Sequence, residues 1–500
     1  MNRNKKLLLN TVMGIIQQVV TIICGFILPR FFLKNFGSNV NGLISSISQF
    51  LGFISLLEMG VGPVIQANLY KPLADGDNTR ISEIVKSAER FFRRIAYIFL
   101  AYIIILSVIF PIAIDTEFDP IFTVSLLVII AISTIAQYFF GATYQVLLNS
   151  DQKSYVQMSL RTVAIILNTA ICIVLMYAGA SVHTVKLVSA SIFVMQPLGQ
   201  MIYVKKHYSL NKKIKLVGEP IKQKWNGFAQ HVAATVSTNA SVFVLTIFSS
   251  LSNVSIYSVY HLVTNGISSV IMTAASGIES FLGNIIAQGD EKTLKKSFDL
   301  IEWVIHFGVT VLFTIAAIAI VPFVTVYTDG VSDADYVQPL FGFLLVFAYM
   351  IQCLRIPYFR VIKASGHFKQ TQNGSFIMAG INIVVSVGLV FRLGLVGVAL
   401  GTLCAMLFHT VYFVLYLRKN ILNRSILYFL KHVLTDAIVV CASFFATSQI
   451  KLASISILSF LIYAIEIAII VTVISIAVNA AFYLKMILPT IRKIKDEKRC

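Results

Sequence analysis

Long apolar segments alternate with short polar ones along the whole of this chain. A segment of about 20 apolar residues is long enough to cross the hydrocarbon core of a bilayer as one α-helix. We expect fourteen such spans, at residues 8–33, 41–67, 95–114, 120–148, 158–178, 184–204, 227–249, 255–285, 300–327, 337–362, 375–391, 395–417, 432–449 and 454–484. The pattern therefore predicts an all-α integral membrane protein with about 14 transmembrane helices.

The same order of apolar segments and polar markers occurs twice. Ser38-Asn39-Val40, before the second span, recurs 214 residues later as Ser252-Asn253-Val254, and Asn168 corresponds to Asn382 at the same offset. This register predicts two pseudo-symmetric six-helix lobes, at residues 1–204 and 227–417, joined by a basic cytoplasmic linker at 205–226. Residues 418–500 add two transmembrane helices and a basic cytoplasmic tail. Duplicated halves are typical of transporters whose substrate site lies between the halves.

Composition and charge agree with a membrane protein. The chain is 57% hydrophobic and only 12% charged, with a formal net charge of +18 and a mean hydropathy of +0.83. Most of its 40 lysines and arginines fall in loops on the same side as both termini, while the opposite loops are short and partly acidic. The positive-inside rule therefore places both termini in the cytoplasm. The basic charge indicates topology and some attraction to anionic lipid, and it does not indicate a nucleic-acid partner.

Several kinds of chemistry lack their usual motifs. The sequence contains no GxxxxGK[ST] phosphate loop, no GxSxG and no HExxH, so we expect neither ATP hydrolysis nor another enzymatic activity. Five of the six cysteines lie inside apolar segments, and no CxxC or Cys/His ligand spacing occurs. We therefore expect no disulfide framework, no metal and no cofactor.

Arginines inside apolar segments are the first candidate site residues. A charge at the bilayer centre costs about 2.5–3.5 kcal/mol on insertion scales, so a retained charge needs a partner or a function. The guanidinium groups of Arg30, Arg355 and Arg360 suit bidentate binding of a diphosphate. The alternative is that Arg30 and Arg360 extend toward the aqueous ends of their helices.

Carboxylates in the spans are candidates for ion coupling. Glu58 lies about two-thirds of the way down its span, and it either pairs with an arginine, contacts substrate, carries a coupling proton or is a structural carboxylate. Glu279, a second coupling candidate, also fits an interfacial position at a helix end. Asp436, in the last pair of spans, is interpreted as a partner of Lys431 or part of a groove. His306 and His409 are interpreted as core residues.

The segment Gly42–Ala74, with Leu-Leu-Glu-Met-Gly-Val-Gly at 56–62, resembles bacterial polysaccharide-transporter flippases of the multidrug/oligosaccharidyl-lipid/polysaccharide exporter superfamily, relatives of the lipid II flippases. Pro29-Arg30 and the segment Arg355–Gly366 agree with this resemblance. It implies a cationic cavity between two lobes and alternating access. The implied substrate is an undecaprenyl-diphosphate-linked oligosaccharide, carried to the outer face of the bacterial plasma membrane for capsule, O-antigen or exopolysaccharide synthesis.

Two other functions stay open on the sequence. An ion-coupled multidrug exporter of the related extrusion family is one, although such exporters typically have twelve spans and acidic cavities. A non-transporting scaffold of a glycan-assembly complex is the other, because the basic linker offers a docking surface for polysaccharide-assembly proteins. Expected partners are thus the polyprenyl-diphosphate-linked glycan, membrane lipid and assembly proteins.

Overall fold

The structure is a computed structural model that describes residues 3–58, 61–114, 118–211, 214 and 228–497. Every regular element among these residues is helical. Among the described residues, twelve helices are long and apolar enough to cross a membrane. The first of them, Lys5–Glu58, contains the expected span 8–33 and most of the span 41–67, because Gly37 (φ 79°) divides α1 (Arg3–Gly52). Another expected span is α9 (Phe228–Phe248). The prediction of an all-α membrane protein with about 14 transmembrane helices is confirmed.

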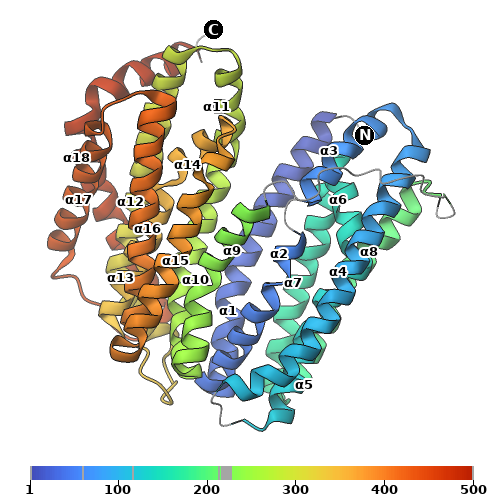
Figure 1. The fold of residues 1–500 in the computed structure, drawn as a ribbon. Coiled ribbons are helices and arrows are strands. Elements are labelled where there is room, and N and C mark those ends of the chain that lie inside the picture. Colours follow the sequence, from blue (N-terminus) through green and yellow to red (C-terminus); the bar gives the residue numbers. More distant parts are fainter. Residues whose placement is uncertain (1–2, 59–60, 115–117, 212–213, 215–227, 498–500) are drawn as a thin grey trace. The chain divides into compact units, whose positions relative to one another are not determined.

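The chain forms two compact units, Met1–Ser255 and Ile256–Cys500 (Figure 1). After α1, the first unit contains α2 (Ser55–Glu58), α3 (Val61–Asp75), α4 (Asn78–Ala113), α5 (Pro120–Ala136), η1 (Gln137–Gly141), α6 (Ala142–Ser150), α7 (Ser154–Tyr177), α8 (Val182–His207), α9 and the start of α10 (Leu251–Ala274). The second contains the rest of α10, η2 (Ala275–Gly277), α11 (Ile278–Ala287), α12 (Glu291–Tyr327), α13 (Pro339–Leu354), α14 (Ile356–Ala364), α15 (Phe368–Leu393), α16 (Leu395–Leu417), η3 (Arg418–Leu422), α17 (Leu427–Thr447) and α18 (Ile457–Glu497). The expected lobe boundaries at 204 and 227 stay a prediction, since the linker 205–226 lies largely outside the described residues.

The second span of each predicted repeat is broken in the structure. In the first unit, α1 ends at Gly52, and the chain continues through the short α2 to α3. In the second unit, α10 ends at Ala274 and continues through one 3-10 turn, η2, into α11. The sequence predicted one span at 41–67 and one at 255–285, and the structure divides each into shorter helices. Glycine and serine are frequent in both segments, and they favour departures from regular helix.

The same turn follows each broken span. Gly76 and Gly289 adopt left-handed backbone angles, with φ of 70° and 71°. Asp77 and Asp290 then cap α4 and α12, each accepting a hydrogen bond from the backbone N–H three residues on, at 2.9 and 3.0 Å. A left-handed glycine ends one helix and an aspartate N-cap begins the next. The duplicated Gly-Asp pair thus has a physical role in both repeats.

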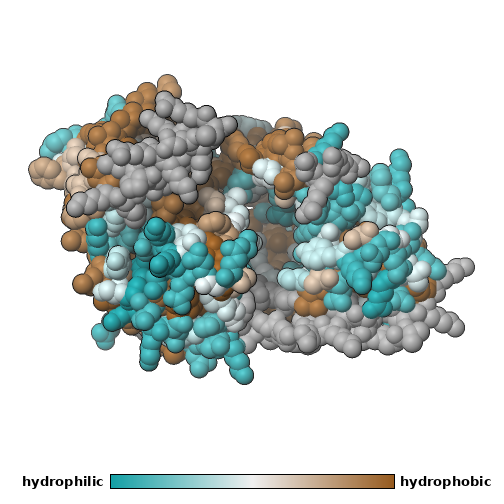
Figure 2. All heavy atoms as spheres, turned by 90° about the horizontal axis from the view of Figure 1, so that it is seen from above, coloured by the Kyte–Doolittle hydropathy of each residue, from teal (hydrophilic) through white to brown (hydrophobic). Residues whose placement is uncertain are grey.

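Apolar side chains cover the flanks of the helices, and polar side chains lie at the ends. Large apolar residues such as Ile112, Val174 and Leu458 expose 65–81% of their surface, as expected for side chains that face lipid. Seen from one end, hydrophilic residues gather on the helix ends, and hydrophobic residues lie around them (Figure 2). This distribution matches a multi-pass membrane protein.

A close backbone contact in the first unit requires glycine. A Cβ atom on Gly42 of α1 would lie 1.8 Å from the carbonyl oxygen of Leu251, whereas one on Gly25 of the same helix would meet nothing within 4 Å. We expect Gly42→Ala to lower stability by about 1–3 kcal/mol or more, because backbone atoms must move. Gly25→Ala should be neutral or stabilising, by up to about 1 kcal/mol. Thermal unfolding of both purified variants tests this, and equal melting temperatures would contradict it.

An ion-pair cluster fixes one end of the first unit. The Asp151 carboxylate accepts hydrogen bonds from the ammonium groups of Lys6 (2.8 Å) and Lys153 (2.7 Å) and from the Tyr208 hydroxyl (2.5 Å). Burial raises the pKa of Asp151, but these three donors outweigh burial and hold the pKa below its usual range. The cluster joins the N-terminal end of α1 to the ends of α6 and α8.

The lowered pKa gives a pH dependence of stability with a defined sign. A carboxylate whose pKa is depressed by folding stabilises the protein above its unfolded pKa of about 3.9, and this stabilisation is lost as the pH falls through the folded value. We expect Asp151→Asn to cost about 1–2 kcal/mol at pH 7 and the cost to shrink below about pH 4. Melting temperatures across this range measure it, with the exposed Asp329→Asn as the matched control. A cost that stays constant with pH would contradict the assignment.

Candidate functional site

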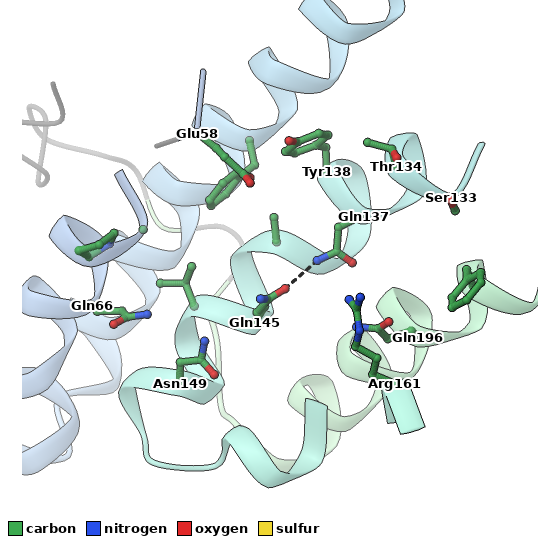
Figure 3. Close-up of a pocket in the computed structure, with 16 residues that line it drawn as sticks. Glu58, Gln66, Ser133, Thr134, Gln137, Tyr138, Gln145, Asn149, Arg161 and Gln196 are labelled. Carbon is green, nitrogen blue, oxygen red and sulfur yellow. Dashed lines mark hydrogen bonds between the residues drawn. The ribbon is translucent and has the colours of Figure 1, made fainter. Parts of the chain in front are cut away.

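A polar cavity of about 680 Å³ lies within the first unit (Figure 3). Its walls come from α2, α3, α4, α7, α8 and the continuous segment α5–η1–α6. The polar part of the lining is formed by Glu58, Gln66, Ser133, Thr134, Gln137, Tyr138, Gln145, Asn149, Arg161 and Gln196. Polar side chains within membrane-spanning helices are costly unless they face one another or a hydrated cavity. The cavity is therefore a candidate binding site.

The π-helical turn η1 shapes one wall of this cavity. Such a turn contains one extra residue, which changes the direction of the side chains that follow, and it is frequent at functional sites. Here the side-chain amide nitrogen of Gln137 donates a hydrogen bond to the side-chain oxygen Oε1 of Gln145 at 2.8 Å. A Cβ atom on Gly141 would lie 2.4 Å from the Gln137 side chain and 2.7 Å from Pro197. Glycine thus allows η1 to pack closely against α8.

Amides dominate the chemistry of the cavity. Each amide offers a donor and an acceptor, so the group suits a ligand rich in hydroxyls and amides. Glu58 lies beside the Tyr138 phenol at one end, and Arg161 lies beside Gln196 at another (Figure 3). The sequence selected Glu58 and missed the glutamines around it. Uncharged amides inside apolar spans were the available signal, because such groups need a polar partner.

Arg30 lies on α1, directly after Pro29. Its side chain is half-buried, and it forms no hydrogen bond or ion pair with another described residue. Its function as a substrate contact stays a prediction.

Arg355 lies at the break between α13 and α14, in the second unit. Its guanidinium contacts the Nδ1 atom of His409 and the sulfur atoms of Met378 (3.5 Å) and Met406 (3.7 Å). None of the described carboxylates pairs with it. Thioether sulfur and neutral imidazole leave the positive charge uncompensated, so Arg355 can attract an anion.

Arg360 and Glu279 are separate candidates in the sequence, one for diphosphate binding and one for ion coupling. The structure brings them together. The Arg360 guanidinium lies 3.0 Å from the Glu279 carboxylate, which Lys363 also approaches at 3.7 Å. The pair joins α11 to α14. Because Glu279 compensates much of the Arg360 charge, a phosphate would have to compete with this carboxylate for Arg360.

A buried polar cluster of the second unit was missed by sequence reasoning. Glu302, fully buried on α12, is bound by Arg424 from the segment before α17. Asp436 pairs with His306, whereas Lys431 donates to the carbonyl oxygen of Phe482. The interpretation of Asp436 as a partner of Lys431 is therefore wrong. The described residues include no group of three or more His, Cys, Asp or Glu arranged to hold a metal ion.

About 14 transmembrane helices among the described residues, divided second spans and a repeated capping turn define a polytopic membrane fold built on a duplicated plan. No protein-family model matches this chain, and no curated protein sequence does. Solved membrane transporters share its fold. The lipid II flippase MurJ, in an inward closed conformation, superposes with a TM-score of 0.71 at 16% identity, covering 95% of this chain and 100% of MurJ.

MATE transporters share the fold over a smaller part of the chain. An inward-facing multidrug-resistance MATE transporter gives a TM-score of 0.58 at 11% identity, covering 80% of this chain and 94% of the transporter. The eukaryotic MATE transporter AtDTX14 gives 0.53 at 15% identity, covering 83% and 96%. These identities establish the common fold alone.

Proposed function

We propose that this protein is a flippase that moves an undecaprenyl-diphosphate-linked oligosaccharide from the cytoplasmic to the outer face of a bacterial plasma membrane. The likeness to MurJ over 95% of the chain supports this assignment most directly. The MATE transporters described above cover only 80% and 83% of it. A lipid-linked precursor has a charged diphosphate, a polar glycan and an apolar tail, and a flippase must accommodate all three parts.

Arg30 and Arg355 are the proposed diphosphate contacts. Both lack a carboxylate partner among the described residues, so a phosphate can bind either one without displacing an acid. Arg360 contributes after Glu279 releases it. The amides of the first-unit cavity offer hydrogen bonds for sugar hydroxyls, and Glu58 in the same cavity is the proposed ion-coupling carboxylate.

Alternating access is the proposed mechanism, with both termini in the cytoplasm and with polysaccharide-assembly proteins as partners. Transport of this kind needs no covalent chemistry, so the protein acts as a transporter and not as an enzyme. The coupling residues, Glu58 and Glu279, would change protonation or ion occupancy as the substrate site changes its exposure.

Ligand-induced stabilisation separates this function from drug export. We expect undecaprenyl diphosphate to raise the melting temperature of the purified chain in detergent, because a ligand that binds only the folded state stabilises it. Undecaprenyl monophosphate should act more weakly, and the cationic drug analogue tetraphenylphosphonium should have no effect. Stabilisation by the cation alone would favour the multidrug exporter. Stabilisation by neither lipid nor cation would favour the scaffold.

A further inference from the structure

A second set of titratable groups lies buried in the second unit, where α12, α14, α17 and α18 meet. Glu302 of α12 is at its centre, with its side chain 1% exposed. Its carboxylate accepts hydrogen bonds from Arg424 at 2.5 and 2.6 Å and from the Tyr358 hydroxyl at 2.5 Å. Arg424 also binds Asp299 at 2.7 Å, and Asp299 is 39% exposed. Glu302 is thus a buried carboxylate whose charge is matched by Arg424.

A histidine–aspartate pair continues this network one helical turn further along α12. The Nδ1 atom of His306 lies 2.6 Å from one Asp436 oxygen, and the Thr310 hydroxyl donates to the other at 2.8 Å. On its opposite side, the Nε2 atom of His306 lies 3.3 Å from the Tyr358 hydroxyl oxygen. Polar contacts therefore run without interruption from Asp436 through His306 and Tyr358 to Glu302.

The protonation of His306 follows from the direction of these hydrogen bonds. The single proton of the Tyr358 hydroxyl is donated to Glu302, so the phenol oxygen presents lone pairs to Nε2 of His306. The Asp436 carboxylate likewise presents an acceptor to Nδ1. When Asp436 is ionised, both ring nitrogens face acceptors, and both positions are satisfied only when each carries a proton.

A second histidine connects this network to a cavity. The His432 ring stacks on that of His306 with 4.7 Å between centroids, its Nδ1 lies 2.8 Å from the Tyr483 hydroxyl, and its Nε2 lies 3.5 Å from Glu302. His432 also lines a cavity of about 570 Å³ together with Asp299 and Lys431. His432 thus lies between this cavity and the buried network, which it contacts at Glu302.

Among the described side chains of the neighbouring helices, the other charged groups do not contact Glu302, His306 or Asp436. Glu279 of α11 pairs with Arg360 and Lys363. The described α13 carries no Asp, Glu, Lys or Arg. Lys431 of α17 donates to the Phe482 carbonyl oxygen and lies 4.3 Å from the centre of the Tyr483 ring, so it is the charged group nearest to His432 on the cavity side. Glu466 of α18 is exposed.

We propose that His306, held between Asp436 and Tyr358, is a proton-binding site that exchanges protons with the cavity through His432. With the proton bound, α12 is joined to α17 by a charge-assisted hydrogen bond. After the proton leaves, Asp436 stays buried without a cationic partner, and the contact between the two helices weakens. The role of His306 in coupling rests on the proposed transport function. It concerns neither Glu58 nor Glu279.

Nitrogen chemical shifts of the histidine rings test proton binding without any substrate. We expect full-length protein with ¹⁵N-labelled histidine to show one ring with both nitrogens protonated at pH 7. His306→Gln should remove that signal, and Asp436→Asn should convert it to a neutral ring. His183→Gln, in the first unit, is the matched control and should leave it unchanged. A His306 ring that stays neutral from pH 5 to 8 would overturn the proposal.

The coupling role has its own test. In vesicles, we expect transport by the intact protein to change at least tenfold between pH 6 and 8, and this dependence to be lost in His306→Gln and His432→Gln. If His306 is protonated but both variants keep the pH profile of the intact protein, the coupling role is overturned. The protonated His306 would then have a structural role only. No transport by the intact protein would reject the proposed function, while the ring spectra would still decide whether the proton site exists.

Discussion

Replacing Arg424 with glutamine is expected to destabilise the protein by about 3–5 kcal/mol, the largest stability effect that we predict. The substitution leaves the Glu302 carboxylate buried without its cation, at a side-chain exposure of 1%. A buried charge without a partner costs far more than the ion pair itself contributes. Unfolding of the purified protein by a denaturing detergent measures the loss.

Two further variants test whether the loss of stability comes from the unpaired Glu302 charge or from any substitution in this region. Arg418→Gln removes an equal charge from an exposed position in the neighbouring η3, so it should change stability by no more than about 0.5 kcal/mol. Adding Glu302→Gln to Arg424→Gln should recover part of the lost stability, since the unpaired charge is then removed. A double variant that is less stable than Arg424→Gln would contradict the account.

Replacing Arg355 with glutamine is expected to lower transport about ten- to hundredfold while the protein still folds. A charge-assisted hydrogen bond to phosphate contributes about 1.5–3 kcal/mol, and this is lost with the guanidinium. The stability cost should be small by comparison, because Arg355 has only sulfur and imidazole partners and no carboxylate is left unpaired. Arg355→Lys should retain part of the activity, since it keeps the charge and loses the planar fork.

The matched control for this prediction is Arg392→Gln. Arg392 is an exposed arginine in the last turn of α15, and its loss should leave transport unchanged. Equal losses of transport in the Arg355 and Arg392 variants would indicate a general effect of charge. Loss of transport together with loss of folding in Arg355→Gln would show that Arg355 is structural.

The fold was predictable because its strongest requirements act within single segments. A bilayer needs about 20 apolar residues for each helix and leaves no backbone polar group unpaired, so the spans can be read directly. The repeated Gly-Asp turn was also present in the sequence, since a left-handed glycine and an N-cap aspartate are local features. The positions of the helix breaks were harder to predict, because glycine and serine permit a break without fixing the residue at which it occurs.

The site was less predictable, because its contacts join distant segments. Glu302 and Arg424 are 122 residues apart, and each alone resembles a charge at a helix end. Arg360 and Glu279 were both selected, but their pairing depends on how α11 packs against α14. One signal was available and unused: Glu302, His306 and Thr310 recur every four residues, which places them on one face of α12.

Lipid translocation in vesicles tests the central claim most directly. The probe is an undecaprenyl-diphosphate-linked disaccharide with a fluorescent group on its sugar, present in both leaflets of vesicles that contain the purified protein. An impermeant quencher added outside reports the fraction of headgroups that reach the outer leaflet. The flippase account predicts that quenching extends beyond the outer half in the presence of the intact protein and falls back toward one half with Arg355→Gln. Quenching that stops at one half with the intact protein, as in protein-free vesicles, would contradict the account.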